Sequence, residues 1–188
     1  MKSIGVFCGS SAGESAVYMD AARETGAFFA ARGVDIVYGG GRVGLMGAVA
    51  DSALQQGGSV TGVMPQALVE REIAHRELTH LHVVENMHQR KTRMAELSSF
   101  FIALPGGAGT LEEIFEQWTW GQLGIHNKPC AFYNVNNFYS PLKVMVEKIV
   151  TEGFMKQSYS DMLLFSDDLQ EIMNFFENYI PPTSKWQK

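Results

Sequence analysis

The chain has 188 residues, of which 46% are hydrophobic, and this length predicts one domain at residues 1–180 with a short C-terminal tail at 181–188. With 15 Lys and Arg against 20 Asp and Glu, the formal net charge is −5, which argues against a partner that is a nucleic acid. No uncharged apolar stretch reaches the ~18–20 residues that cross a bilayer, and the N-terminal apolar run is too short for a signal peptide, so we expect a cytoplasmic protein without a membrane partner.

Short β-rich runs alternate with longer helical patterns along the chain. In chain order, we expect a strand at 3–8, a helix at 16–32, a strand at 34–38, a helix at 45–56, strands at 59–64 and 81–84, a helix at 87–98, a strand at 100–104, a helix at 111–123, a strand at 131–135, a helix at 141–152, a strand at 162–165 and a helix at 169–179. Alternation of this kind indicates βαβ units, and continuous apolar strands indicate a sheet covered on both faces. The sequence therefore predicts an α/β fold with a doubly wound, mostly parallel sheet and helices on both faces.

Glycines are concentrated after three of the predicted strands. Thirteen of the 19 glycines lie in residues 1–62, none lies between 64 and 105, and five lie in 106–124. The resulting glycine-rich loops are at 9–13, 39–47 and 106–109. Because ligands of doubly wound sheets bind beyond the carboxyl ends of the strands, we expect the three loops to gather at one sheet edge and to form a ligand site.

The second loop, GGGRVG at 39–44, matches the G-x-G-x-x-G pattern of dinucleotide sites. Such a site also needs an acidic residue at the end of the next strand to hold the ribose, but that strand ends in VMP at 63–65. NAD and FAD are therefore not favoured, and the absence of G-x-x-x-x-G-K-[ST] argues against P-loop ATP chemistry. The alternative is that these glycines only close turns against the following helix.

The third loop, PGGAGTLEE at 105–113, is more specific. Its glycines let backbone N–H groups point at an anion, and the N-terminus of the following helix adds about half a positive charge. Thr110 is a candidate to cap the helix or to bond the anion, and we expect Glu112 and Glu113 in the first helical turn. Helix capping is one explanation for these carboxylates. Because they would repel an anion, a contact with another part of the ligand, such as a sugar, makes better sense.

Three cations lie in the opening turns of the helix predicted at 87–98, in the segment MHQRKTR at 87–93. Cations at a helix N-terminus oppose the helix dipole, so a structural role is not the obvious one. This helix leads into the strand that precedes the third glycine loop. Its N-terminus is therefore expected at the same sheet edge if that strand runs parallel to the others. A solvated charged face is the alternative.

The cysteines and clustered histidines have simpler interpretations. Cys8 and Cys130 both lie in apolar runs and are most simply buried thiols. His75, His80 and His82 are close in sequence but lack Cys or Asp partners at the spacing of zinc ligands. We therefore expect no metal site.

Four segments carry a family resemblance: FCGSSAG at 7–13, VYGGGRVGLMGAVAD at 37–51, MHQRK at 87–91 and LPGGAGTLEEIFEQWTWGQLGIHNKP at 104–129. On these segments the chain resembles the LOG (LONELY GUY) proteins over nearly its whole length up to about Ser160. M-H-x-R-K together with P-G-G-x-G-T-x-x-E is highly specific for that family. The resemblance implies a Rossmann-like, usually dimeric cytokinin riboside 5'-monophosphate phosphoribohydrolase, which splits an adenine-type base from ribose 5-phosphate.

The resemblance also implies which residues form the site. It assigns Arg90 and Glu113 as the catalytic pair. The implied substrate-binding positions are Glu72, Lys91, Gly106, Gly107, Ala108, Gly109, Thr110, Glu112 and Thr119. The candidate substrate-binding residues also include Gly9, Ser10, Gly40 and Gly41 of the first two glycine loops and Met87 of the MHQRK segment. The implied partners are a nucleoside 5'-monophosphate substrate and a second copy of the chain, and neither a cofactor nor a metal ion is expected.

The chemistry of the reaction agrees with these residue types. Cleavage of an N-glycosidic bond builds oxocarbenium character on the sugar, and a carboxylate near C1 stabilises that charge and activates water. This role is assigned to Glu113. For Arg90, three roles stay open: it orients Glu113, binds the ribose phosphate or assists the leaving base.

Alternative functions also stay open. A narrower enzyme would be a general AMP nucleosidase, and a different class would be a non-catalytic nucleotide carrier or sensor built on the same loops. The presence of both Arg90 and Glu113 favours the enzyme. LOG proteins were long mislabelled as lysine decarboxylases, but that chemistry uses pyridoxal phosphate on a Schiff-base lysine with an acidic partner, and no match for such a site is found here.

Overall fold

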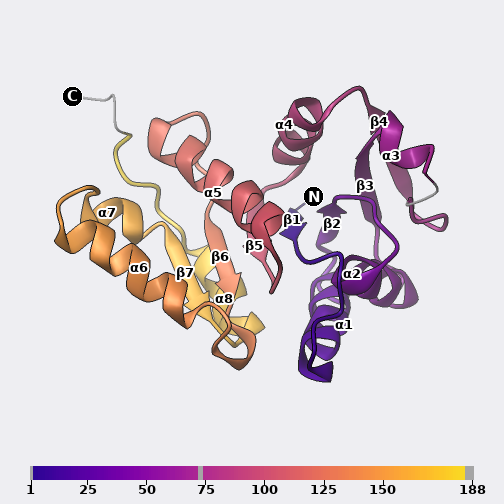
Figure 1. The fold of residues 1–188 in the computed structure, drawn as a ribbon, viewed down its shortest axis with the longest axis horizontal. Coiled ribbons are helices and arrows are strands. Elements are labelled where there is room, and N and C mark those ends of the chain that lie inside the picture. The colour runs from indigo at the N-terminus through magenta and orange to yellow at the C-terminus, as the bar shows by residue number, and fades with distance from the viewer. Residues whose placement is uncertain (1, 72–73, 185–188) are drawn as a thin grey trace.

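A single parallel sheet forms the centre of the molecule in the computed structural model, which describes residues 2–71 and 74–184. Its strands are β1 (Ser3–Phe7), β2 (Asp35–Tyr38), β3 (Val60–Pro65), β4 (His80–Val84), β5 (Phe100–Ala103), β6 (Cys130–Tyr133) and β7 (Leu163–Ser166). They are ordered β4-β3-β2-β1-β5-β6-β7, and every neighbouring pair is parallel. Figure 1 shows this order across the molecule, with β1 near its middle. The predicted α/β fold with a doubly wound parallel sheet is confirmed.

Helices connect most of the strands. They are α1 (Ala16–Ala30), α2 (Gly44–Gln55), α3 (Gln66–Val69), α4 (Met87–Leu97), α5 (Ala108–Leu123), α6 (Ser140–Thr151), α7 (Gln157–Ser160) and α8 (Leu169–Glu177), with a 3-10 helix at Val135–Asn137. The long helices match the predicted ones to within three residues at each end. The short pieces α3, α7 and the 3-10 helix were not predicted, because a single turn shows no apolar periodicity. Among the described residues, no helix is both long and apolar enough to cross a membrane.

Side chains of the strands alternate between two hydrophobic cores, one on each face of the sheet. Ile4 and Val6 of β1 pack in a core with α1, α2 and α8, whereas Phe7 packs on the other face with α4 and α5. All three side chains are at most 2% exposed. Right-handed crossovers account for the two layers, because strands added on opposite sides of β1 require helices on opposite faces.

The strand order reverses at β1, and the three glycine loops meet there. The N–H of Gly9, after β1, donates to the carbonyl oxygen of Pro105, after β5, at 3.0 Å. The N–H of Leu45 donates to the carbonyl oxygen of Gly9 at 3.1 Å, which joins the loop after β2 to the same place. Gly44 has a φ of +61°, and a Cβ there would lie 2.3 Å from the carbonyl carbon of Ser10. The predicted gathering of the loops at one sheet edge is confirmed.

Helices α1 and α2, which follow the first two glycine loops, pack side by side on one face of the sheet (Figure 1). Gly26 of α1 allows this close approach. A Cβ on Gly26 would lie 2.2 Å from the carbonyl oxygen of Val49 and 2.2 Å from Oγ of Ser52, both on α2. Oγ of Ser52 also donates to the carbonyl oxygen of Arg23 at 2.6 Å. The backbone of α1 at Gly26 therefore lies directly against α2.

Replacement of Gly26 by Ala is expected to lower the free energy of unfolding by about 1–3 kcal/mol, because the added methyl group must push α1 away from α2. Helix propensity alone predicts the opposite sign, since Ala is favoured over Gly by about 1 kcal/mol. Urea denaturation measures the effect. The matched control is Gly109→Ala, where a Cβ meets no atom within 4 Å. A Gly26→Ala protein as stable as the original would contradict the close packing.

Candidate active site

Helix α5 begins at Ala108, and its N-terminus carries no side-chain cap. The N-cap residue is Gly107, whereas the side chains of Ser15, Asn86 and Asp168 cap α1, α4 and α8. The first N–H groups of a helix have no partner within the helix, and residues 107–109 are exposed here. The start of α5 is therefore open to an anion, which agrees with the interpretation of its glycines.

One expectation for this motif was wrong, and one of the two alternatives for Thr110 is excluded. Glu112 and Glu113 do not lie in the first turn of α5, because the helix starts three residues before the predicted position and moves both into the second turn. Thr110 does not cap the helix: it is 4% exposed within the first turn, where a Cβ on Gly106 would lie 2.1 Å from its Oγ1. Helix capping therefore does not explain why Glu112 and Glu113 occur in this motif.

A cavity of about 290 Å³ lies at the point where the strand order reverses, beside the start of α5. Residues 9–13 and 105–107 line it, together with the side chains of Leu45, Tyr18 and Phe138. The two aromatic rings meet edge to face, with their centroids 5.9 Å apart. Four of the predicted substrate-binding residues line this cavity, namely Gly9, Ser10, Gly106 and Gly107.

Arg90, near the start of α4, is bonded directly to Glu113 on α5. Its Nη1 lies 3.0 Å from Oε1 of Glu113, and the two side chains are only 12% and 11% exposed. Its Nε donates to the carbonyl oxygen of Val63, near the end of β3, at 3.1 Å. Nη1 also lies 3.9 Å from Sδ of Met87. The two residues predicted as a catalytic pair therefore form a nearly buried ion pair, and a solvated charged face does not describe Arg90.

Burial raises the pKa of the Glu113 carboxyl above its ordinary value of 4.5, and the charge of Arg90 opposes this rise. The neighbouring Glu112 raises the pKa further. A carboxylate out of water is costly unless a cation stays beside it, and Arg90 supplies that cation. A buried acid with a raised pKa and a specific charged partner, at the ligand edge of a sheet, is typical of a functional group.

Lys91, the next residue along α4, makes a second set of ion pairs with α5. Its Nζ lies 2.6 Å from Oε1 of Glu112 and 3.1 Å from Oε1 of Glu116, and its side chain is 9% exposed. The hydrogen bond to Glu112 raises the pKa of Lys91, so the ammonium group stays charged. Lys91 and Glu112 were both predicted to bind substrate, and here they bind each other and fasten α4 to α5 beside the Arg90–Glu113 pair.

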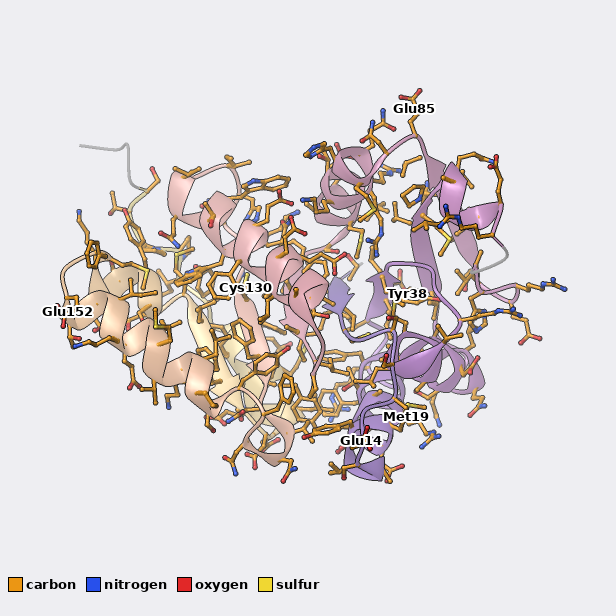
Figure 2. All side chains as sticks on the ribbon, in the orientation of Figure 1. Glu14, Met19, Tyr38, Glu85, Cys130 and Glu152 are labelled. Atoms are coloured by element: carbon orange, nitrogen blue, oxygen red, sulfur yellow. The ribbon has the colours of Figure 1, made fainter. Side chains whose placement is uncertain are left out.

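Gly40 and Gly41 are buried and bonded within the protein. Gly40 has a φ of +81°, and its carbonyl oxygen accepts from the N–H of His75 at 2.9 Å. The carbonyl oxygen of Gly41 accepts from the hydroxyl of Tyr38, labelled in Figure 2, at 3.0 Å. These two residues shape the loop and are not among those that line the cavity. The preceding Gly39 lies against Arg90 instead.

Three predicted positions remain, namely Thr119, Met87 and Glu72. Thr119 is exposed on α5, six residues beyond Glu113, which corresponds to about 9 Å along the helix axis. The structure therefore does not bring Thr119 to the pair. Met87 is 44% exposed next to Arg90. Glu72 lies outside the described residues.

The cysteines are buried free thiols, as predicted. Cys130 lies on β6 in the core that α5 covers (Figure 2). Burial raises the pKa of both Cys8 and Cys130, so neither is suited to act as a nucleophile. His75 is buried, with Nε2 2.8 Å from Oδ1 of Asp51. Within residues 2–71 and 74–184, no group of three or more His, Cys, Asp and Glu side chains is arranged to hold a metal ion.

Comparisons with known proteins identify the family. A family model described as "Possible lysine decarboxylase" matches residues 46–176. The chain is 44% identical to the cytokinin riboside 5'-monophosphate phosphoribohydrolase LOG1 of Arabidopsis thaliana, over 98% of this chain and 86% of that protein. It is 47% identical to a cytokinin riboside 5'-monophosphate phosphoribohydrolase of Rhodococcoides fascians, over 90% of this chain and 86% of that protein. The chain belongs to the LOG family.

The fold of this LOG protein is shared more widely. It is similar to the solved structure of a molybdenum cofactor binding protein from Rippkaea orientalis, with a TM-score of 0.71 and 17% identity over 94% of this chain and 95% of that one. At such low identity the likeness shows a common fold alone. It confirms the predicted Rossmann-like sheet.

Several contributors to the LOG site were not predicted from the sequence. Tyr18 and Phe138 reach the cavity from α1 and from the segment after the 3-10 helix, and no short-range pattern connects them. Glu116 completes the ion pairs of Lys91, and its position four residues after Glu112 was a usable signal, because residues at that spacing share a helix face.

Replacement of Lys91 by Met is expected to lower the free energy of unfolding by about 1–3 kcal/mol, because Glu112 and Glu116 lose their shared, largely buried partner. The matched control is Arg93→Met on the same helix. Arg93 and Glu96 are 40% and 58% exposed, and a pair of this kind contributes about 0.2–1 kcal/mol. Urea denaturation compares the two variants, and equal losses would contradict the structural role of Lys91.

Proposed function

We propose that this LOG protein hydrolyses the N-glycosidic bond of an adenosine 5'-monophosphate, N6-substituted or unsubstituted, and releases the free base and ribose 5-phosphate. The curated relatives from Arabidopsis and Rhodococcoides are named for this reaction on cytokinin nucleotides. The observation that carries the proposal is the buried Arg90–Glu113 ion pair beside the open start of α5. Helix α5 thus carries both an open N-terminus suited to an anion and Glu113, a carboxyl group of raised pKa.

The 5'-phosphate would bind at the start of α5. Ala108 and Gly109 are exposed there, the first N–H groups of a helix have no partner within it, and the helix dipole favours negative charge. Gly107 has no side chain to block the approach. The adjoining cavity, which Gly9 and Ser10 also line, gives the phosphate room beside the helix.

Glu113 would act at the ribose C1. It lies six residues after Gly107, about 9 Å along the helix axis, and side chains of a helix lean back toward its N-terminus. A ribose 5-phosphate held at the helix start can therefore reach this carboxylate. Once ionised, Glu113 stabilises the positive charge that develops on the sugar and orients the attacking water.

Arg90 would keep Glu113 ionised and in place. Because its positive charge opposes the effect of burial on the pKa of Glu113, it favours the carboxylate form that the chemistry needs. Its bonds to Val63 and Glu113 fix the guanidinium at the sheet edge. Of the three roles left open by the sequence, the orientation of Glu113 is therefore the one that these contacts favour.

A lysine decarboxylase is not the function that this site favours. A lysine that forms a Schiff base must first become a neutral amine. The site lysine, Lys91, is held by two carboxylates, and its pKa is raised rather than lowered.

The remaining expectations concern assembly and location. We expect the protein to act as a homodimer in the cytoplasm, without nucleic acid. Leu81, Val83 and Met87, on β4 and at the start of α4, are 38–48% exposed and offer an apolar surface for a second copy. The formal net charge of −5 disfavours nucleic acid, and two buried free thiols fit a reducing compartment.

The direct test is to incubate the purified protein with AMP and with N6-isopentenyladenosine monophosphate, and to measure free base and ribose 5-phosphate. We expect equal amounts of base and ribose 5-phosphate from at least one substrate, and the ratio of the two rates shows which base is preferred. Binding of both nucleotides without release of base would contradict the proposal and favour a carrier.

Substitution of Glu113 by Gln is expected to lower kcat by about 10²–10³-fold, because the charge that stabilises the transition state is lost while the shape of the side chain is kept. Binding should persist, since the phosphate site at the start of α5 is untouched. Steady-state kinetics and a nucleotide titration measure the two effects. Turnover near that of the original protein would rule out the role of Glu113.

The pH dependence of kcat/KM should report Glu113. The ionised form is the active one, so activity is expected to fall as the pH drops through the pKa of Glu113. Burial raises this pKa above 4.5, so the loss should begin at a higher pH than for an exposed glutamate. A profile over about pH 4 to pH 8 measures it. Persistence of the same acid limb in Glu113→Gln would show that another group causes it.

A further inference from the structure

Gly39, the residue after β2, lies directly against the guanidinium of Arg90. A Cβ built on Gly39 would be 2.0 Å from Nη2 of Arg90 and 3.1 Å from its Cζ, and its three nearest atoms all belong to Arg90. Gly39 itself is buried. Because Gly39 has no side chain, the guanidinium of Arg90 can occupy the space beside its Cα.

The backbone of Gly39 does not need glycine for its conformation. Its φ lies outside the left-handed region, unlike that of the neighbouring Gly40, where φ is +81°. An alanine at position 39 would thus be free of the backbone strain that it would cause at position 40. A methyl group at position 39 would collide with the end of the flexible Arg90 side chain. The Arg90 side chain would therefore have to move, whereas the main chain could stay in place.

A shift of the guanidinium would disturb the contacts that hold it. Nε donates to the carbonyl oxygen of Val63 at 3.1 Å, and Nη1 pairs with Glu113 at 3.0 Å. The fork of the guanidinium is rigid, so Nη2 cannot move away from Gly39 while Nε and Nη1 keep both partners. Gly39 after β2, Val63 on β3 and Glu113 on α5 therefore enclose the group from three sides.

We propose that Gly39 is a positioning residue of the active site: its missing side chain lets Arg90 lie against the end of β2 and so sets the geometry of the Arg90–Glu113 pair. This inference rests on the proposed hydrolysis, in which that pair acts. It adds a residue that acts through Arg90, whose atoms are the three nearest to a Cβ built at position 39.

The test is the variant Gly39→Ala, which displaces the guanidinium but removes no charge. We expect kcat to fall by about 10²-fold, because misplacement of a catalytic group by about 1 Å has an effect of this size. We also expect the acid limb of the pH profile to move to higher pH, since Arg90 lowers the pKa of Glu113 and would now lie farther away. The matched control is Gly121→Ala, in which the Cβ also meets the end of a flexible side chain, Cε of Met162 at 2.7 Å.

The same substitution in an Arg90→Lys protein distinguishes an effect on the position of Arg90 from general damage to the structure. The side chain introduced by Arg90→Lys has no atom equivalent to Nη2, so Gly39→Ala should have little further effect on the kcat of an Arg90→Lys protein. An equal loss of kcat from Gly39→Ala in the original and the Arg90→Lys backgrounds, or the same loss in Gly121→Ala, would overturn the inference.

An NMR titration of the Glu113 carboxyl carbon needs no turnover and so distinguishes the two proposals. If the original protein releases no base, the proposed function fails, and the titration still tests whether position 39 controls the pair. A higher pKa of Glu113 in Gly39→Ala than in Gly121→Ala supports the inference. An unchanged pKa contradicts it.

Discussion

The ion pair between Arg90 and Glu113 is the interaction on which the rest of this LOG site depends. Both side chains are nearly buried, so each has lost most of its hydration, and neither charge is tolerable there without the other. The pair also joins α4 to α5, and the Lys91 bonds to Glu112 and Glu116 join the same helices one residue farther along α4. The carboxylate that would serve the reaction is thus part of the structural link between the two helices.

The topology of the sheet brings these helices together. The chain adds β2, β3 and β4 on one side of β1 and then returns through α4 to place β5 on the other side. Because α4 and α5 precede and follow β5, they pack as neighbours on one face, and the start of each points to the carboxyl edge of the sheet. The glycine loops meet at that edge, where the N–H of Gly9 donates to Pro105, so the proposed anion site and the ion pair lie at the same edge. The edge where the strand order reverses therefore holds both the glycine loops and the Arg90–Glu113 pair.

Much of this arrangement could be predicted from the sequence, because local signals carried it. Apolar strands, alternating helices and glycines after strands indicated the sheet and its ligand edge, and the long helices were placed within a few residues. The start of α5 was misplaced, because Gly109 and Thr110 are poor helix formers and yet lie within the helix. The sequence did not predict the ion pairs of Lys91 or the contact of Gly39 with Arg90. Both depend on side chains from helices and strands that are distant in sequence. Such contacts have no signature in a single sequence, and the role proposed for Gly39 depends on its position against Arg90 in the folded chain.

The central claim is that Arg90 and Glu113 act as one unit in cleavage of the N-glycosidic bond. A kinetic double-mutant cycle with Arg90→Met, Glu113→Gln and the double variant tests it most directly, with kcat measured on the better of the two adenosine monophosphate substrates. If the pair acts as a unit, the double variant should be about as slow as the slower single variant, because the second substitution removes nothing that still functions. Losses in kcat that multiply in the double variant would show that the two residues act independently and would contradict the account.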